Sequence, residues 1–310
     1  MRVIFMGTPD FAVGTLRAIY EAGHEVCLVV TQPDKPKGRG HAMQYTPVKE
    51  YAAEKGMEVF QPLKIKEQEA IEKLRACQAD IMVVAAFGQL LPKEILEMCP
   101  YGCINVHASL LPKYRGAAPI QWVIIDGEKE SGVTIQQMNE GLDTGDIISK
   151  VVVPIDEKET GGSYHDKLAK AGAKLCVDTM KEMAEGKSTR TPQKEEASCY
   201  AKKLQKELGK LDFTKEAVEI ERLIRGLNPW PSAYTTLHGK TLKIWAADVE
   251  DKEYEGAVGT VVAKTKQGII VKTGKGALVI TELQLAGKKR MTTESFLLGY
   301  EVQEGEKLGC

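Results

Sequence analysis

The chain has 310 residues, a length that suggests about two domains of typical size. Hydrophobic residues make up 43% of it and charged residues 27%, which is ordinary for a soluble globular protein. Its 42 lysines and arginines against 43 acidic residues give a net charge of -1, which excludes a wholly basic nucleic-acid-binding protein and a strongly acidic disordered one.

The first two hundred residues alternate between short apolar runs and helical patterns. Runs rich in valine and isoleucine predict buried parallel strands at Arg2–Met6, Val26–Thr31, Asp80–Ala86 and Cys103–Ala108. Helical patterns predict a first helix that Asp10 caps, and further helices at Pro47–Lys55, Glu67–Ala76 and Tyr164–Glu185. This alternation predicts an open α/β sheet with right-handed crossovers.

The pattern changes after about Gly186, where a polar stretch without periodicity predicts a linker. A helical pattern follows at Lys215–Gly226. Short strand-like runs separated by glycine-containing turns come next, at Ala233–Leu237, Leu242–Ala246, Gly256–Val262, Gly268–Lys272 and Ala277–Leu283. Several short strands at this spacing predict a small barrel. We therefore expect domains at residues 1–189 and 206–310, joined by a linker at 190–205.

Charge divides unevenly between the two parts of the chain. Residues 201–310 hold 18 of the basic and 15 of the acidic residues, which leaves 24 basic and 28 acidic residues for the remainder. The second domain is therefore modestly positive, although the whole chain is almost neutral, and a local interaction with a polyanion stays compatible with the overall charge.

The sequence predicts neither a membrane segment nor a disulfide framework. Its longest apolar runs, such as Ile81–Phe87, fall far below the ~20 residues that span a bilayer, and without a visible targeting motif we expect a cytoplasmic protein. The seven cysteines are scattered and odd in number, which argues against disulfides. Cys99, Cys103 and His107 recur every four residues, but the intervening proline and glycine break the helix that a shared metal would need, so no metal is expected.

The run from Cys103 to Ser109 carries polar side chains where a buried strand should be apolar. One face of the predicted strand is apolar throughout, whereas the other carries Asn105, His107 and Ser109. The strand then ends at Leu110-Leu111-Pro112, so the polar groups lie near its carboxyl end, where open α/β sheets bind ligands. A functional site is favoured here over a histidine and an asparagine that merely hydrogen-bond to each other.

A second candidate lies at Gly141–Asp146, where Asp143 stands in a glycine-rich loop that also fits a simple turn. Together with Asn105 and His107 it suits acyl transfer, because amide and imidazole N–H groups can stabilise a developing oxyanion. Asp143 can orient His107, or receive a proton through water from an attacking amine. Since no serine-centred nucleophile elbow is present, direct attack by a substrate amine is expected.

Two groups of basic residues stand outside these motifs. Residues 32–46 form a long polar connection that contains Lys35, Lys37 and Arg39. Such connections are usually functional or disordered, and a basic, glycine-rich tip can bind phosphates, although a solvated surface loop is the alternative. The second group is predicted to place Lys203, Lys206 and Lys210 on one face of a helix.

Motifs along nearly the whole chain point to one family. They are Met6–Ala12, Thr31–Pro36, Gly38–Gly40, Asn105–Pro112, Arg115–Gln121, Gly141–Asp146 and Asn228–Ala233. This set resembles the methionyl-tRNA formyltransferase family. The Asn-x-His, Ser-Leu-Leu-Pro and later Asp mark the wider class that uses 10-formyltetrahydrofolate, while the basic loop and the second domain point to the member that acts on tRNA.

The resemblance implies a Rossmann-like formyltransferase domain and a C-terminal barrel resembling an OB-fold. It implies transfer of formyl from 10-formyltetrahydrofolate to the α-amine of methionyl initiator tRNA. The implied catalytic residues are Asn105, His107 and Asp143, and the implied folate-binding residues are Ser109, Leu110, Leu111 and Pro112. For tRNA, the implied or expected contacts are Phe11 with the methionine side chain, Lys37 and Arg39 with the acceptor stem, and Lys203, Lys206 and Lys210. We expect a monomer.

Two alternative functions are left open by the sequence. An enzyme of the same chemistry could act on a small amine, such as glycinamide ribonucleotide or an amino sugar, but this leaves about 110 C-terminal residues and the basic loop without a role. A non-catalytic RNA-binding protein would not need Asn105, His107 and Asp143 together.

Overall fold

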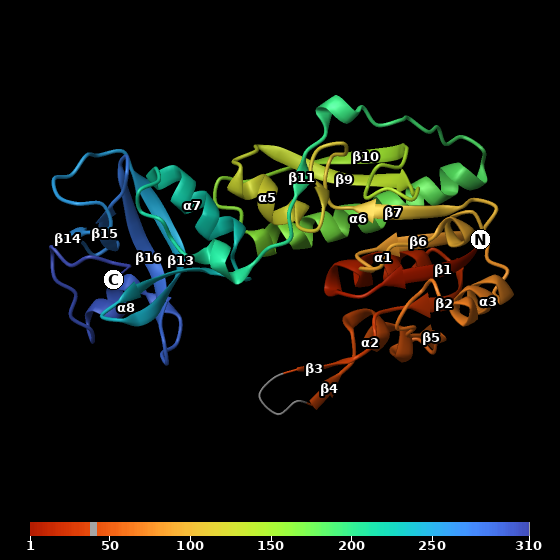
Figure 1. Cartoon of the computed structure of the whole chain (residues 1–310), viewed down its shortest axis with the longest axis horizontal. Coiled ribbons are helices and arrows are strands. Elements are labelled where there is room, and N and C mark those ends of the chain that lie inside the picture. Colours follow the sequence, from red (N-terminus) through yellow and green to blue (C-terminus); the bar gives the residue numbers. More distant parts are fainter. Residues whose placement is uncertain (38–41, 310) are drawn as a thin grey trace. The chain divides into compact units, whose positions relative to one another are not determined.

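The computed structural model describes residues 1–37 and 42–309 and contains two compact units. The first is made of Met1–Pro119, Glu130–Pro154 and His165–Ala201, and the second of Ile120–Lys129, Ile155–Tyr164 and Lys202–Cys310. Figure 1 labels most of the helices and strands of both. Within the described ranges, no helix combines the length and the apolar character that a membrane span requires.

The first unit is built on a seven-stranded sheet in the order β10-β9-β7-β6-β1-β2-β5. Its strands are β1 (Arg2–Gly7), β2 (Glu25–Val30), β5 (Val59–Phe60), β6 (Ile81–Ala85), β7 (Cys103–His107), β9 (Glu130–Gln137) and β10 (Ile147–Pro154). The five strands from β5 to β7 pair in parallel, whereas β9 and β10 add antiparallel strands beyond β7. The expected Rossmann-like α/β architecture is confirmed, and the two antiparallel strands and the short β5 are additions to the four predicted strands.

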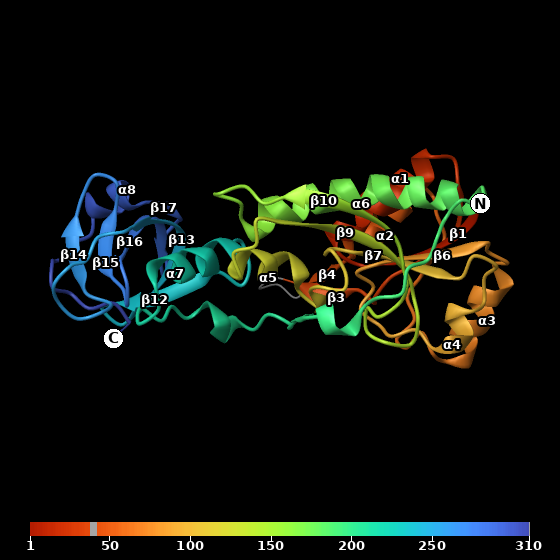
Figure 2. The same cartoon turned by 90° about the horizontal axis from the view of Figure 1, so that it is seen from above.

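Helices cover both faces of this sheet. They are α1 (Asp10–Glu21), α2 (Pro47–Glu54), α3 (Gln68–Ala76), α4 (Lys93–Leu96) and α6 (Gly161–Ala184). Figure 2 shows α1 and α6 on one side of the sheet and α3 and α4 on the other. Gly172 lets α6 approach closely, since a Cβ added there would lie 3.0 Å from Val106 Cγ1. On the opposite face, Ile71 and Leu74 of α3 join a buried cluster with Cys103 of β7.

The first helix begins differently from the prediction, because its N-cap is Pro9 and not Asp10. Pro9 has the extended backbone of a capping position, so Asp10 falls inside the first helical turn. The Asp10 carboxylate accepts a hydrogen bond from Phe11 N at 3.0 Å. The helix dipole still stabilises its negative charge at the N-terminal end of the helix. Asp10 is therefore a first-turn residue and the prediction of an Asp10 cap is wrong.

The long polar connection after β2 contains a hairpin. Strands β3 (Lys35–Lys37) and β4 (Ala42–Gln44) pair in antiparallel register, with Lys37 opposite Ala42. At its base, Lys49 Nζ lies 2.5 Å from Asp34 Oδ2 and 2.7 Å from Gln61 Oε1. The predicted tRNA contact Arg39 lies outside the described residues.

The segment expected as a linker pairs with the first unit before the chain enters the second. Thr191 exchanges two backbone hydrogen bonds with Ile147, at 2.8 and 2.9 Å. Further along, β11 (Tyr200–Ala201) pairs in parallel with β8 (Arg115–Gly116). A short 3-10 turn, Glu195–Ala197, lies between these two contacts. Residues 191–201 are thus held at both ends by backbone hydrogen bonds.

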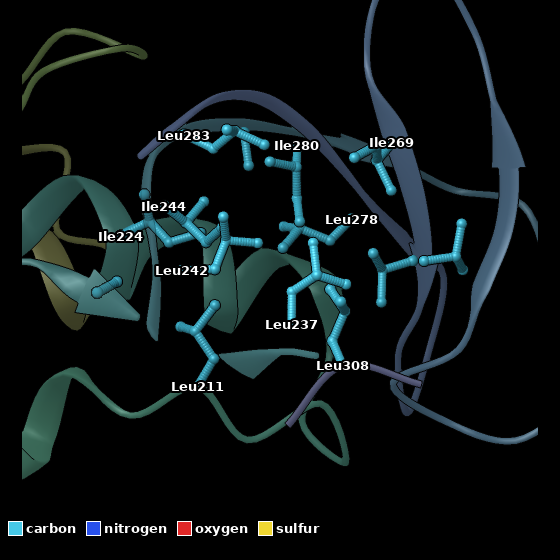
Figure 3. Close-up of a cluster of buried hydrophobic side chains, with 14 of the residues drawn as sticks. Leu211, Ile224, Leu237, Leu242, Ile244, Ile269, Leu278, Ile280, Leu283 and Leu308 are labelled. Atoms are coloured by element: carbon cyan, nitrogen blue, oxygen red, sulfur yellow. The ribbon is translucent and has the colours of Figure 1, made fainter. Parts of the chain in front are cut away.

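The second unit carries a six-stranded antiparallel sheet and confirms the expected OB-like domain. The main path runs in the order β12-β13-β16-β15-β14, and β17 pairs with β16. The elements are β12 (Ala233–Leu237), β13 (Lys240–Glu250), β14 (Val261–Lys264), β15 (Ile269–Lys272), β16 (Ala277–Leu285), β17 (Met291–Thr292), α5 (Pro119–Ile125), α7 (Ala217–Gly226) and α8 (Thr293–Leu297). Its core brings side chains of β12, β13, β15 and β16 against Ile224 of α7 and Leu308 near the C-terminus (Figure 3).

The prediction that Lys203, Lys206 and Lys210 share a helical face is wrong. Only a short 3-10 turn, Lys206–Gly209, forms in this segment. Beyond it the chain is extended, because Leu211 N donates to Tyr234 O at 2.9 Å and Lys210 forms a bridge with Tyr234 of β12. Pairing with the sheet therefore replaces the helix, although all three lysine side chains are exposed.

Candidate active site

Strand β7 delivers two polar side chains to one face of the sheet. Val106 points toward α6, so by strand alternation Asn105 and His107 lie on the same face as Cys103, which belongs to the cluster under α3. Asn105 is 9% exposed and His107 is 6% exposed. Because His107 is the last residue of the strand, both polar groups lie at its carboxyl end, as the sequence indicates.

Asp143 reaches the same place from the loop between β9 and β10. Its carboxylate Oδ1 lies 3.5 Å from Asn105 Nδ2 and 3.6 Å from His107 Nδ1. Asp143 has a φ of 53°, in the left-handed region that few residues with a side chain adopt. A Cβ added at Gly145 would lie 1.8 Å from Gln137 O, so only glycine lets the loop fold back this tightly on β9. The structure thus brings the three predicted catalytic residues together.

Two donors outside that triad hold the Asp143 carboxylate. Gln136 of β9 donates from Nε2 to Asp143 Oδ1 at 2.9 Å. The backbone N–H of Gly116 donates to Asp143 Oδ2 at 2.8 Å. Gly116 has a φ of 107°, a conformation that favours glycine, and this conformation aims its N–H at the carboxylate. Both carboxylate oxygens therefore have a close hydrogen-bond partner.

The ring of His107 is oriented by a backbone carbonyl. Its Nε2 lies 2.9 Å from the carbonyl oxygen of Tyr114. A carbonyl oxygen only accepts hydrogen bonds, so Nε2 carries the ring proton and donates a hydrogen bond to the carbonyl oxygen of Tyr114. The other ring nitrogen, Nδ1, is left on the side of Asp143.

The predicted folate-binding residues follow β7 directly, and the backbone of this segment is pinned by β9 and β10. Ser109 is fully buried, and its carbonyl oxygen accepts from Thr134 Oγ1 at 2.7 Å. The same hydroxyl accepts from Leu111 N at 3.1 Å. Lys150 of β10 donates from Nζ to Leu111 O, and burial lowers the pKa of this lysine. The remaining two predicted folate-binding residues, Leu110 and Pro112, are sequence neighbours of Leu111, whose backbone is held in this way.

Phe11 lies near the start of α1 and is 6% exposed. Its ring meets the edge of His165 on α6, with the ring centroids 5.5 Å apart. Phe11 thus packs in the contact between α1 and α6. Lys37 lies on the β3–β4 hairpin, and the three lysines at 203, 206 and 210 lie at the start of the second unit.

Cys99 and Cys103 are buried thiols. Burial raises the pKa of Cys99 to about 11 and raises the pKa of Cys103 as well, which favours the neutral thiol over the thiolate that binds metals. Among the residues that the structure describes, no group of three or more histidine, cysteine or acidic side chains is arranged to hold a metal ion.

Sequence reasoning missed several groups that contact the triad. Gln136 shares one face of β9 with Thr134, but the strand is also polar at Glu130, Ser131 and Gln137, so no interruption of an apolar run marks Gln136 in the sequence. Arg115 and Gly116 belong to a motif already singled out, yet no role followed from it. Gln193, which donates to the carbonyl oxygens of Asp143 and Gly145, lies in a stretch without any pattern.

Comparison with known proteins identifies the class of enzyme that carries this fold and site. Residues 1–180 match the family model described as formyl transferase, and residues 203–301 match the one described as formyl transferase, C-terminal domain. The chain is 62% identical to the methionyl-tRNA formyltransferase of Agathobacter rectalis, over 98% of each chain. It is 52% identical to the methionyl-tRNA formyltransferase of Bacillus subtilis, over 99% of this chain and 98% of that one. The chain therefore belongs to the methionyl-tRNA formyltransferase family.

Solved structures share the fold at much lower identity. The N-formyltransferase of Helicobacter canadensis, in complex with folinic acid and dTDP-3-aminofucose, matches with a TM-score of 0.65 and 19% identity, over 93% of this chain and 99% of that one. HypX of Aquifex aeolicus, in complex with tetrahydrofolic acid, matches with a TM-score of 0.62 and 19% identity, over 96% of this chain and 47% of that one. At this identity the likeness concerns the fold.

Proposed function

We propose that the chain transfers the formyl group of 10-formyltetrahydrofolate to the α-amine of methionyl initiator tRNA, with Asn105, His107 and Asp143 as its catalytic residues. Membership of the methionyl-tRNA formyltransferase family supports the acceptor. The folate bound to two proteins of the same fold supports the donor. The observation that carries the catalytic assignment is the meeting of the buried Asn105 and His107 of β7 with the partly buried Asp143.

The residues present fit a formyl donor. An amide N–H on Asn105 and a ring nitrogen on His107 stand on either side of one carboxylate oxygen, so donors to a carbonyl oxygen and an acceptor for a proton are available together. The segment from Ser109 to Pro112 begins two residues after the end of β7, and its anchoring to Thr134 and Lys150 gives it a fixed backbone. We propose that this segment holds the folate.

In the proposed reaction the neutral methionyl amine attacks the formyl carbon. A nitrogen–carbon bond forms as the bond from the carbon to the folate nitrogen breaks, and the proton lost by the amine is returned to the departing nitrogen. Asn105 donates to the formyl oxygen, and His107 donates to it from Nδ1 once that nitrogen has taken a proton, so both stabilise the negative charge that develops there. Asp143 orients His107 and takes part in the proton transfer.

His107 gains and loses a proton at Nδ1 during the proposed reaction. Its Nε2–H is committed to the carbonyl of Tyr114, so this nitrogen holds the ring in place and does not exchange a proton. Nδ1 faces Asp143 Oδ1, and a proton that arrives there is shared with a carboxylate. Asp143 thus lies beside Nδ1, the ring nitrogen that gains and loses the proton in the proposed reaction.

For the tRNA we propose two sets of contacts. Lys37, on the β3–β4 hairpin, and Arg39 contact the acceptor end. The second unit, with Lys203, Lys206 and Lys210, contacts the stem. Phe11 contacts the methionine side chain. Lysine and arginine contacts with phosphates release counterions, so the affinity for tRNA falls steeply as salt is raised. We further propose that the protein is a monomer and acts in the cytoplasm, where translation is initiated.

The test offers three amines to the full-length protein in the presence of 10-formyltetrahydrofolate. Methionyl initiator tRNA, methionyl elongator tRNA and glycinamide ribonucleotide are incubated separately, and the formylated product is identified by mass spectrometry. Formylation of the initiator tRNA alone supports the proposal. Formylation of glycinamide ribonucleotide in preference to tRNA shows an enzyme for small amines, and tRNA binding without formylation shows a non-catalytic RNA-binding protein; either result rejects it.

A further inference from the structure

Gln193 makes an unusual set of contacts for a residue in the segment that the sequence predicts as a linker. Its side-chain Nε2 donates to two backbone carbonyl oxygens, Asp143 O at 2.8 Å and Gly145 O at 2.7 Å. Both acceptors belong to the loop that presents the Asp143 carboxylate to His107. One amide nitrogen therefore holds the backbone of this loop at two points.

A buried arginine fixes the orientation of that amide. Arg115 is 1% exposed, and its Nε and Nη2 donate to Gln193 Oε1 at 3.1 and 3.0 Å. A guanidinium has donors only, so the oxygen of Gln193 must face Arg115 and the NH₂ group must face the loop. Burial disfavours the charge of Arg115, but hydrogen bonds with Glu195 and Tyr200 outweigh this and raise the pKa of the guanidinium. Arg115 remains a cation, and the orientation of the Gln193 amide does not switch.

The loop needs such a restraint because of its conformation. Asp143 adopts a positive φ, and a residue in this region keeps it only where its surroundings enforce it. The two hydrogen bonds between Thr191 and Ile147 fix the backbone just before Gln193 to the strand just after the loop. The Gln193 side chain then reaches across to the loop from a fixed base.

We propose that Gln193 is a positioning residue for catalysis, which acts by holding the Asp143 loop in the conformation that aims the carboxylate at His107. This inference rests on the catalytic role proposed for Asp143. It gives the segment at 191–201 a part in the chemistry, in addition to joining the two units. Misplacement of a reacting group by about 1 Å costs about 100-fold in rate.

The test uses two variants of the full chain. Gln193→Glu has the same shape and keeps the acceptor for Arg115, but it turns a carboxylate oxygen toward the two carbonyls. Gln193→Met removes the donor without adding a charge. Both are expected to lower kcat for formylation by about 100-fold, while the KM values for tRNA and folate change less than about twofold. Gln267→Glu, at an exposed position of the second unit, makes the same charge change and is expected to keep wild-type activity.

A double-mutant cycle with Asp143→Asn separates positioning from general stabilisation. If Gln193 acts through Asp143, Gln193→Met has little further effect on kcat in the Asp143→Asn background. Equal losses in both backgrounds show that Gln193 acts elsewhere and overturn the inference, as does full kcat in the two Gln193 variants. If Asp143→Asn itself keeps full turnover, the catalytic role proposed for Asp143 fails, and this outcome is distinct from the failure of Gln193 alone.

Discussion

Gln136 donates a hydrogen bond to the carboxylate of Asp143 while its own carbonyl oxygen is left unsatisfied. The donor Nε2 lies 2.9 Å from Asp143 Oδ1, and Oε1 is buried without a hydrogen-bond partner among the described residues. A buried acceptor without a partner costs about 1–3 kcal/mol. Such a cost is typical of functional sites, where the geometry of a reacting group matters more than stability. The contact with Asp143 therefore explains why a polar side chain is buried here.

We expect Gln136→Glu to change the pH dependence of the reaction. The substitution places a second carboxylate beside Asp143 in a site that is almost closed to solvent, and two adjacent carboxylates cannot both ionise readily. If catalysis uses ionised Asp143, the acid limb of the profile of kcat against pH moves to higher pH. Gln136→Met is the matched neutral variant and should lower kcat without this displacement. Superimposable profiles for the wild type and Gln136→Glu would contradict the contact.

We expect Asn105→Ala to lower turnover far more than binding. Loss of one donor to an oxyanion typically slows the reaction by about 100–1,000-fold. The binding of tRNA should change little, because Asn105 is 9% exposed and is not one of the basic residues assigned to tRNA. Single-turnover formylation and filter binding of tRNA measure the two quantities separately. Asn105→Asp keeps the shape and removes the donor, so it should be equally slow; near-full turnover in either variant would remove Asn105 from the catalytic residues.

Those residues of the site that could be predicted from the sequence are the ones marked by a local sequence pattern. Asn105 and His107 interrupt an apolar strand, and this interruption marks them before any tertiary contact is known. Four strands of the parallel part of the sheet, β1, β2, β6 and β7, are likewise visible as runs rich in valine and isoleucine, whereas the two-residue β5 is not predicted. Strand β9 is less visible, because Ser131, Thr134 and Gln136 are polar yet almost fully buried, and burial of polar groups depends on partners that periodicity does not reveal.

The segment at 191–201 shows the limit of such reasoning. Its residues are mostly polar and exposed, and their local pattern is that of a linker. Its order comes from backbone hydrogen bonds with residues more than forty positions away, at Ile147 and Arg115. The lysines at 206 and 210 show the same effect in the second unit, where pairing with β12 overrides a helical spacing.

We expect Lys150→Met to weaken the binding of folate. Lys150 donates to the carbonyl oxygen of Leu111, in the segment proposed to hold the folate, and its removal leaves that oxygen without this donor. A charge-assisted hydrogen bond of this kind contributes about 1.5–3 kcal/mol, so the KM for 10-formyltetrahydrofolate should rise by about tenfold or more. The KM for tRNA serves as the internal reference. Lys170→Met, at an exposed position of α6, is the control and should leave both values unchanged.

The base of the β3–β4 hairpin provides a test of stability against pH. Burial tends to raise the pKa of Asp34, but the hydrogen bonds from Lys49 and Gln61 outweigh it and lower the pKa. A carboxyl whose pKa is lower in the folded state stabilises the fold fully above its ordinary value of about 4, and this contribution is lost as pH falls through the folded value. Asp34→Asn should therefore destabilise the protein at pH 7 and not in acid.

The expected loss at pH 7 is about 1 kcal/mol, since the side chains of Asp34 and Lys49 are 14% and 19% exposed and the pair is only partly screened. For a domain of this size the unfolding midpoint falls by roughly 2–4 °C. Thermal unfolding of wild type and Asp34→Asn is compared from pH 7 down into the acid range, and the two midpoints should converge as the pH falls through the lowered pKa of Asp34. Lys55→Met removes an exposed ion pair with Glu54 and is the control, with no expected change at pH 7. A difference between wild type and Asp34→Asn that stays constant with pH would show that the Asp34 charge does not hold the hairpin.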